Sequence, residues 1–368
     1  MSDIAAFQPD WFSRPGDTLL TLMEERELSA EALADRIGCR HSVVRGLLAG
    51  TTSIDDDLAN RLAQHVGGTS SFWLVRQSKY VAALARAAKA VPDAVGAEWV
   101  KQFPHRDIVN YGWMDRSIER NKLTAAYLAY FGVSSPGEWA DRYSNFSDST
   151  AFRTSPTFKS KVGAISTWLR QGEIEASALH CGQWRPDQLR QRLQELRILT
   201  KAKSPSYFLP RLRKICADSG VALVFVRAPS GCSASGATRF VSANKAMVIL
   251  SFRYLSDDHF WFTFFHELGH LLLHSEKLTF VDGEPGMTDE AEAEANSFSA
   301  EVLIPSNRCE EMMDLRPRRD PIIRFAYSVG VAPGIVVGQL QHRQLLRRSQ
   351  LNFLKRRFDW DQIRAAVD

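Results

Sequence analysis

The chain has few cysteines and no long uncharged hydrophobic segment. Its five cysteines are scattered through 368 residues without a C-x-x-C pair, which argues against a disulfide framework and favours ordinary reduced thiols. No apolar run reaches membrane-spanning length without a charge, and residues 1–12 lack the basic-then-apolar pattern of a secretion signal. We therefore expect a cytoplasmic protein that does not associate with membranes.

The chain also has little net charge. Lys and Arg number 46 against 42 Asp and Glu, which gives a formal charge of +4. This balance predicts modest and strongly salt-dependent non-specific affinity for DNA. The hydrophobic content of 45% is sufficient for cores in two or three domains.

The strongest motif is H-E-x-x-H inside the apolar segment 264–273 (FFHELGHLLL). Helical residues four apart lie about 40° apart around the axis, so His266 and His270 can point their imidazoles at one metal ion beside Glu267. A catalytic zinc leaves one position open for water and lowers its pKa toward about 7. The adjacent carboxylate can then accept a proton and pass it to a leaving amine. The alternative is an apolar helix that carries two histidines by chance, but burial of Glu267 in such a helix needs a reason.

A third ligand is expected from the segment 288–302 (TDEAEAEANSFSAEV). A helical projection gives an apolar stripe that comprises Ala291, Ala295, Phe298 and Val302. It also gives a separate charged face that comprises Glu290, Glu294 and Glu301. Glu292 stands apart from both groups, one turn before Asn296. We predict Glu292 as the third ligand and Asn296 as the residue that orients it or a histidine ligand. A solvated role is the usual alternative for any single helical glutamate.

These two segments carry a family resemblance. The runs 266–274 (HELGHLLLH) and 292–305 (EAEANSFSAEVLIP) resemble the ImmA/IrrE family of zinc metallopeptidases, whose pattern is HExxH, then Glu four residues before Asn or Asp, then a small-residue helix ending near Pro. The resemblance implies a gluzincin-like zinc metalloendopeptidase with Glu267 as general base. It implies these Zn²⁺ ligands: His266, His270 and Glu292.

A helix-turn-helix is predicted at residues 28–50 (LSAEALADRIGCRHSVVRGLLAG). Small Ala34 lies where the helices cross, Gly38 forms the turn and Val44 packs the second helix. Residues 16–80 resemble the XRE-type DNA-binding domain of HigA-like antitoxins along their whole length. That resemblance implies groove-facing residues on operator DNA: Arg40, His41, Ser42 and Arg45. Arg45 could contact guanine in a bidentate manner; the alternative is a helix-turn-helix retained only for dimerisation or protein contact.

Composition and pattern predict a mostly α fold with a small β-sheet. We expect a five-helix domain with the helix-turn-helix at 1–84, a helical middle domain at 85–203, and a zincin-like α+β domain at 204–368 that ends in a helical hairpin. Short β-branched runs predict three strands, at 221–226, 237–241 and 246–252. The edge strand of this sheet could bind a substrate chain in extended form.

Several other side chains have no assigned role. His259 and His274 are candidates for stabilising an oxyanion because they lie near the motif, although each is as readily a buried histidine. Cys232, in a Gly/Ser-rich loop, could in principle cap the metal. A basic stretch could touch nucleic acid or form a solvated face, and it comprises Arg343, Arg347, Arg348, Lys355, Arg356 and Arg357.

The resemblance to HigA-like regulators fused to an ImmA/IrrE domain extends over nearly the full chain. It implies a homodimeric DNA-binding transcriptional regulator whose peptidase cleaves a protein partner, such as a repressor, in a stress, phage-defence or toxin-antitoxin circuit. The alternative is a HigA-like antitoxin and autorepressor that binds a toxin encoded nearby and uses its metal for stability or sensing. Intact Glu267 favours the enzyme, whereas residues 16–80 favour the antitoxin.

Overall fold

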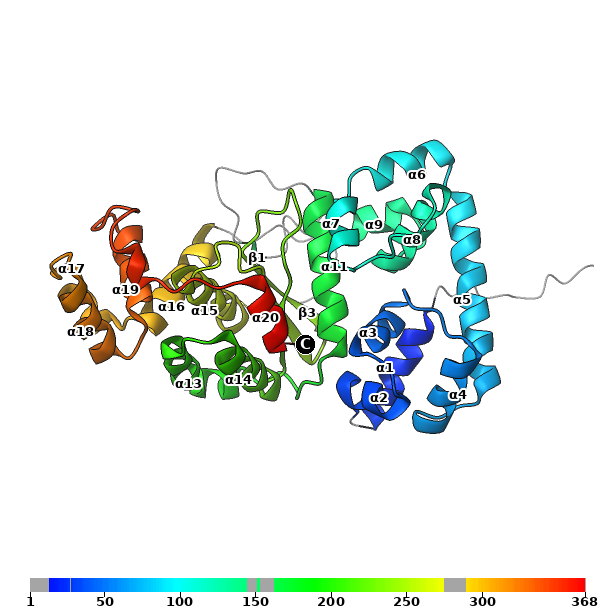
Figure 1. Cartoon of the computed structure of the whole chain (residues 1–368), viewed down its shortest axis with the longest axis horizontal. Helices are drawn as coiled ribbons and strands as arrows, with labels where there is room; N and C mark the ends of the chain where they lie inside the picture. The colour runs from blue at the N-terminus through cyan, green and yellow to red at the C-terminus, as the bar shows by residue number, and fades with distance from the viewer. Residues whose placement is uncertain (1–12, 27, 144–150, 153–161, 275–288, 368) are drawn as a thin grey trace, which may run out of the picture. The chain divides into compact units, whose positions relative to one another are not determined.

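The computed structural model describes residues 13–26, 28–143, 151–152, 162–274 and 289–367 (Figure 1). The residues examined for a secretion signal, 1–12, lie outside this part. As predicted, the fold is mostly helical with one small sheet. Contacts divide the chain into two compact units: unit 1 is 1–144 with 162–180, and unit 2 is 145–161 with 181–368. The predicted middle segment, 85–203, is thus shared between the two units.

Unit 1 is helical. Its elements are α1 (Pro15–Glu25), α2 (Ala30–Ile37), α3 (His41–Ala49), α4 (Asp56–His65), α5 (Ser70–Ala90), α6 (Asp93–Val100), α7 (His105–Asn110), η1 (Arg120–Lys122), α8 (Leu123–Phe131), α9 (Pro136–Tyr143) and α11 (Val162–Ala178). The Ser29 hydroxyl caps α2 by accepting the Ala32 N–H at 3.1 Å. Gly38, with φ of 63°, ends α2 and makes the turn into α3, because glycine adopts this left-handed backbone without strain.

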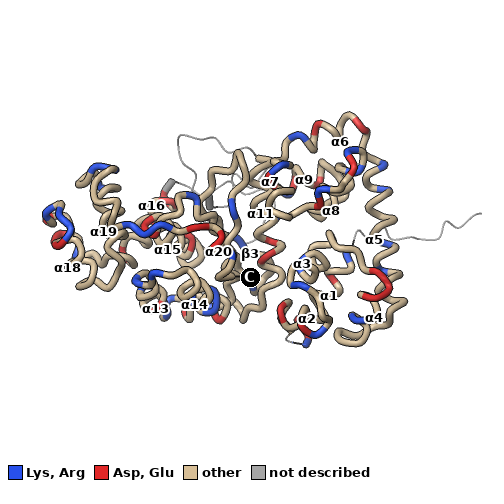
Figure 2. Tube along the Cα trace, in the orientation of Figure 1, with Lys and Arg blue, Asp and Glu red and all other residues tan. Residues whose placement is uncertain are grey.

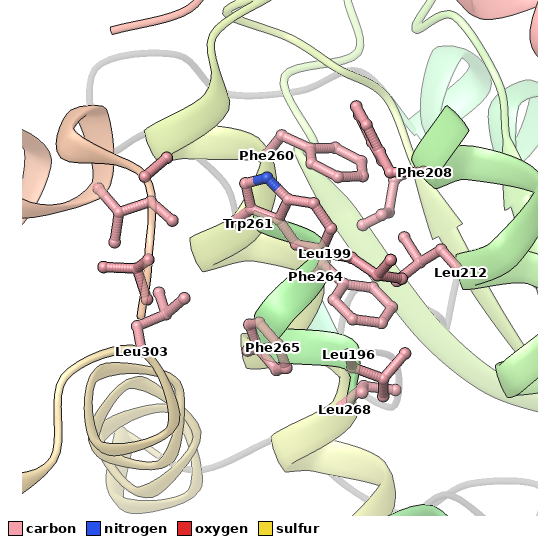
Figure 3. Packing of buried hydrophobic residues seen from close by; sticks show 14 of the residues in the cluster. Leu196, Leu199, Phe208, Leu212, Phe260, Trp261, Phe264, Phe265, Leu268 and Leu303 are labelled. Carbon is pink, nitrogen blue, oxygen red and sulfur yellow. The ribbon is translucent and has the colours of Figure 1, made fainter. Parts of the chain in front are cut away.

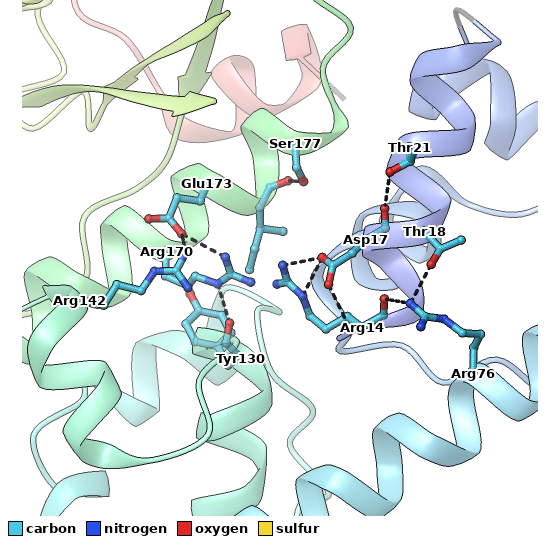
Figure 4. Close-up of polar contacts among 11 residues, drawn as sticks. Arg14, Asp17, Thr18, Thr21, Arg76, Tyr130, Arg142, Arg170, Glu173 and Ser177 are labelled. Carbon is cyan, nitrogen blue, oxygen red and sulfur yellow. Dashed lines mark hydrogen bonds and ion pairs between the residues drawn. The ribbon is translucent and has the colours of Figure 1, made fainter. Parts of the chain in front are cut away.

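Helix α11 carries buried polar side chains that contact other helices of unit 1 (Figure 4). Arg170 is only 4% exposed, and its Nε donates to the Tyr130 carbonyl at 2.7 Å while Nη1 pairs with Glu173 at 3.0 Å. These contacts join α11 to α8, and α11 also packs against α3. A buried guanidinium needs such partners because its desolvation is otherwise costly. The position of α11 explains why residues 162–180 belong to the same unit as the first helices.

Unit 2 contains the sheet and the remaining helices. Its elements are β1 (Ala151–Phe152), α12 (Pro186–Gln191), α13 (Leu193–Ile198), η2 (Leu199–Lys201), α14 (Pro205–Asp218), β2 (Val221–Phe225), β3 (Gly236–Ser242), β4 (Lys245–Leu250), α15 (Asp257–Leu273), α16 (Asp289–Leu303), η4 (Ser306–Arg308), α17 (Cys309–Met313), α18 (Arg319–Val329), α19 (Pro333–His342), η5 (Asn352–Leu354) and α20 (Trp360–Val367). The three predicted strands correspond to β2, β3 and β4.

The strand order is β1-β3-β4-β2. Strand β4 pairs parallel to β2 and antiparallel to β3, with Thr238 opposite Val248. An edge strand of the sheet is expected to bind a substrate chain. On the β3 side, the backbone of β1 pairs antiparallel with β3, with Ala151 opposite Thr238 and Phe152 opposite Ala237. This pairing was not predicted, because β1 lies in a region that the sequence indicates to be helical.

Helix α15 runs through the core of unit 2 (Figure 3). Phe260, Trp261, Phe264, Phe265 and Leu268 are buried on it and pack against residues of α13, η2, α14 and α16, including Leu196, Leu199, Phe208, Leu212 and Leu303. Burial of these large apolar side chains supplies the main driving force for fixing the helix. The residues of α15 that bear chemistry are therefore held on a rigid element.

Helices α18 and α19 cover the segment for which a helical hairpin was predicted, and Gly330 at φ of 80° ends α18. Their apolar residues, including Phe325 and Val336, pack into the core of unit 2. Within the described residues, no single helix is long and apolar enough to cross a membrane. The α18–α19 pair, bent by 107°, meets the test only when both helices are taken together, by length and composition.

Candidate metal centre

Two histidines of α15 face each other across one helical turn. The Nε2 atoms of His266 and His270 lie 3.0 Å apart, and both side chains are fully buried. The four-residue spacing therefore places both imidazoles on one side of α15, as predicted.

Helix α16 supplies the third group. Its Glu292 lies 3.3 Å from His266 Nε2 through Oε2 and 3.3 Å from His270 Nε2 through Oε1. Close packing of α16 on α15 makes this possible, because a Cβ added at Gly269 would lie 3.2 Å from the Cα of Ala295.

The three side chains form a group that could hold a metal ion. Tetrahedral zinc, with bonds of about 2.0–2.2 Å, separates its ligand atoms by roughly 3.3–3.5 Å. The ligand atoms here are separated by 3.0 to 3.3 Å. Two imidazoles and a carboxylate are also one of the donor sets found in catalytic zinc sites. The residues present therefore fit a zinc ion.

The charge state of Glu292 suits a metal ligand. Burial by itself would raise the pKa of this carboxyl, but hydrogen bonds and charge attraction from His266 and His270 outweigh burial and lower the pKa to about 2. Glu292 is therefore an anion near neutral pH.

The outer nitrogens of both histidines are also held. Asn296 Oδ1 lies 3.1 Å from His266 Nδ1, in the orienting role predicted for Asn296. His270 Nδ1 lies 3.3 Å from His274 Nδ1, and His274 Nε2 lies 2.7 Å from Glu294 Oε2. A proton on each outer Nδ1 leaves Nε2 with its lone pair toward the metal position.

This arrangement revises two expectations. His274 lies behind His270, on the side away from Nε2, so its position does not fit that of an oxyanion partner. Glu294, which the helical projection placed on a charged outer face, is 56% exposed but contacts His274. Sequence reasoning missed this pair, although the four-residue spacing from His270 to His274 was a usable signal.

Glu267 faces the sheet. The Thr238 hydroxyl of β3 donates to Glu267 Oε2 at 2.7 Å, and the Glu267 side chain is fully buried. Gly236 leaves the space that the carboxylate needs, since an added Cβ would lie 2.5 Å from Glu267 Oε1. Neither Thr238 nor Gly236 was singled out from the sequence. Thr238 lies in the predicted strand 237–241 and Gly236 directly precedes it, but nothing in their spacing indicated that these two residues contact Glu267.

Two other candidates stand apart from the metal group. His259 is 49% exposed and lies nearly two turns before His266. Cys232 is absent from the candidate group found among the described residues.

The comparison with protein families coincides with this site. Residues 220–331 match the IrrE N-terminal-like domain family (Peptidase_M78). The match runs from the start of β2 to the turn after α18 and includes every residue of the metal group. No curated protein and no solved structure gives a significant match to the chain. Unit 2 thus contains an IrrE N-terminal-like domain, and its His-His-Glu group suggests a zinc peptidase site.

The residues predicted to contact DNA lie in unit 1, on and before α3. Arg40 and Ser42 are exposed, and His41 is half-buried. Arg45 points into the unit, where its Nη1 pairs with Glu175 Oε2 of α11 at 2.6 Å. In this conformation the guanidinium expected to contact guanine is already bound to a carboxylate.

Proposed function

We propose that unit 2 is a zinc-dependent endopeptidase that cleaves a protein partner, such as a repressor, in a stress, phage-defence or toxin-antitoxin circuit of the cytoplasm. The observation that carries the proposal is the convergence of His266, His270 and Glu292 beside the buried carboxylate of Glu267. A metal site that served only for stability would not need a buried acid next to it. The family match over residues 220–331 supports the same assignment.

Different residues of the chain have separate roles in peptide hydrolysis. When bound, a zinc ion would polarise the substrate carbonyl and lower the pKa of water. Glu267 accepts the proton of the attacking water and delivers it to the leaving amine. Thr238 fixes the orientation of the Glu267 carboxylate, and Asn296 and His274 hold the ligand imidazoles in the tautomer that presents Nε2.

The test compares the zinc-loaded protein with its Glu267→Gln variant. Each is incubated with the proteins encoded beside this chain, and the products are measured by intact mass. Cleavage by the wild type alone supports the endopeptidase and identifies its substrate. A stable complex without cleavage by either form would instead support the antitoxin function, with a metal site for stability or sensing.

We further propose that unit 1 binds operator DNA as a homodimer. Support comes from the pair α2 and α3 on either side of the Gly38 turn, and from exposed Arg40 and Ser42 at the start of α3. Binding of labelled DNA from the region upstream of the gene, followed by anisotropy over a salt series, tests this proposal.

A further inference from the structure

The structure divides the basic stretch near the C-terminus into an inner and an outer set. Lys355 is turned inward, where its Nζ contacts Asp258 Oδ2 at 2.6 Å and Gln341 Oε1 at 2.7 Å. Arg356 donates to the carbonyls of Thr200 and Ala202. Figure 2 marks this basic segment just before α20. Lys355 and Arg356 therefore stabilise the fold, and the other arginines of the stretch remain available at the surface.

The outer set lines a pocket of about 880 Å³ beside the N-terminal end of α15. Its lining includes the inward-turned Lys355 and five exposed side chains that can carry positive charge, namely Arg347, Arg348, Arg357, His259 and His342. Asp258 is the one carboxylate among the described lining residues, and Lys355 neutralises it. The pocket therefore has a net positive charge.

The loop that presents Arg347 and Arg348 is held in place by side-chain amides. Gln341 Nε2 donates to the Gln350 carbonyl at 2.8 Å, and Asn352 Nδ2 donates to the Arg348 carbonyl at 2.9 Å. Within the described part of the chain, neither of these two guanidinium groups forms an ion pair or a side-chain hydrogen bond. The loop thus presents both charges toward an external ligand.

Strained backbone occurs in and beside the lining of the same pocket. Gln344, with φ of 61°, lines the pocket. Leu255 and Leu351, with φ of 50° and 58°, directly precede the lining residues Ser256 and Asn352, and Phe252, with φ of 49°, lies outside the lining. These are the non-glycine residues with positive φ in the described chain, and such strain persists where surrounding contacts and function maintain it.

The pocket lies on the face of α15 that carries the metal ligands. Seven residues separate His259 from His266, which corresponds to about 20° around the helix and roughly 10.5 Å along it. The Phe262 ring links the two regions, with its centroid 6.4 Å from that of His342 and 6.5 Å from that of His266. About three or four residues of extended chain span such a distance.

We propose that this pocket binds an acidic segment of the protein substrate, a few residues from the bond that is cleaved. The inference rests on the proposed endopeptidase function and names a feature of its substrate. Arginine side chains bind carboxylates through paired hydrogen bonds. Position favours a peptide over a nucleic acid, because a chain bound at the metal centre reaches the pocket directly. The loop lies beyond the family match, which ends at residue 331.

Binding is tested without hydrolysis, on the full-length zinc-loaded Glu267→Gln variant. The probes are a short labelled peptide with a run of aspartates, the same peptide with asparagines, and a duplex DNA of arbitrary sequence. We expect the aspartate peptide to bind more tightly than the asparagine peptide. Adding Arg347→Glu and Arg348→Glu should weaken its binding by about tenfold at low salt and less at high salt.

The matched control is Arg343→Glu, an exposed arginine of the same stretch that is outside the pocket lining. Equal losses in the Arg343 and the Arg347/Arg348 variants would overturn the proposal, and so would equal affinity for the two peptides. DNA binding that is lost in the Arg347/Arg348 variant, without peptide binding, would assign the pocket to nucleic acid instead. If acidic peptides bind to this pocket but no protein is cleaved, the proposed endopeptidase function is wrong, whereas binding of an acidic segment in the pocket is supported.

Discussion

Helices α15 and α16 of unit 2, which carry the candidate metal ligands, and helices α2 and α3 of unit 1 both follow from residue spacing, yet they use their charged side chains in opposite ways. On α15 and α16, His266, His270 and Glu292 converge on one point and leave the ligand nitrogens and oxygens directed at it. On α3, Arg45 is turned to Glu175 of the same unit. The first arrangement is complete once the chain has folded. The second must change its contacts before Arg45 can contact a base.

Because of this difference, a folded chain tests a predicted metal site more directly than a predicted DNA-binding surface. A metal site requires its residues to meet one another, so the predicted ligands either converge or fail to converge. A base-reading surface requires its residues to remain available for a partner, and folding can use them otherwise.

Removal of a ligand should have the largest effect. His270→Ala deletes one of three converging groups, and we expect zinc affinity to fall by roughly a thousandfold or more, with complete loss of hydrolysis. Zinc competition with a chromophoric chelator measures the affinity. His259→Ala, on the same face of α15 but outside the group, is the control and should retain zinc. Equal zinc binding by His270→Ala and the wild type would remove the distinction between the two regions.

Removal of a contact to the outer nitrogen of a histidine ligand should have the second-largest effect on zinc affinity. His274→Ala removes the partner of His270 Nδ1, and we expect zinc affinity to fall by about 10- to 100-fold. Glu294→Gln, which keeps a hydrogen-bonding group beside His274, should have a smaller effect. The same chelator competition measures both. If His274→Ala bound zinc as tightly as the wild type, His274 would be a packing residue only.

A third change separates catalysis from metal binding. Gly236→Ala places a Cβ against Glu267 Oε1, and the carboxylate must shift. Overpacking of this kind costs about 1–3 kcal/mol, so we expect kcat/KM to fall by about tenfold to a hundredfold with zinc affinity unchanged. Gly137→Ala, where the nearest side-chain atom lies at 3.6 Å, serves as the control. Loss of zinc in Gly236→Ala would mean that the sheet supports the ligands as well as the base.

The residues show why the centre was largely predictable. Ligand spacing of four on one helix fixes His266 and His270 through helix geometry alone. Prediction of Glu292 required only a projection of a second helix, because the sequence determines the order in which a helix presents its side chains. Local composition likewise predicts β2, β3 and β4, because their sequences are rich in β-branched residues.

The parts that were missed depend on contacts between distant segments. Thr238 reaches Glu267 only because β3 packs against α15, and no local pattern specifies that approach. The strand β1 pairs with β3 across more than eighty residues of sequence. Helix α11 joins α8 through a buried Arg170, which resembles any helical arginine in the sequence. Long-range packing of this kind has no periodic signature.

The smallest expected effect concerns the Arg45–Glu175 pair, and it bears most directly on the comparison. Both side chains are about a quarter to a third exposed, so the pair contributes at most about 1 kcal/mol to stability. If α3 binds operator DNA, Glu175→Gln removes a negative charge near the helix and releases Arg45. We expect upstream DNA to bind about three- to fivefold more tightly at low salt, measured by anisotropy.

Two further variants decide what such a gain would mean. Glu98→Gln, which removes an exposed carboxylate of α6 in the same unit, controls for net charge and should change affinity much less. Adding Arg45→Ala to Glu175→Gln should cancel the gain, because the gain depends on the released guanidinium. If both single variants tighten binding equally, Arg45 plays no part in DNA contact. In that case the charged group of α3 would serve the fold alone, and the contrast with the metal centre would be complete.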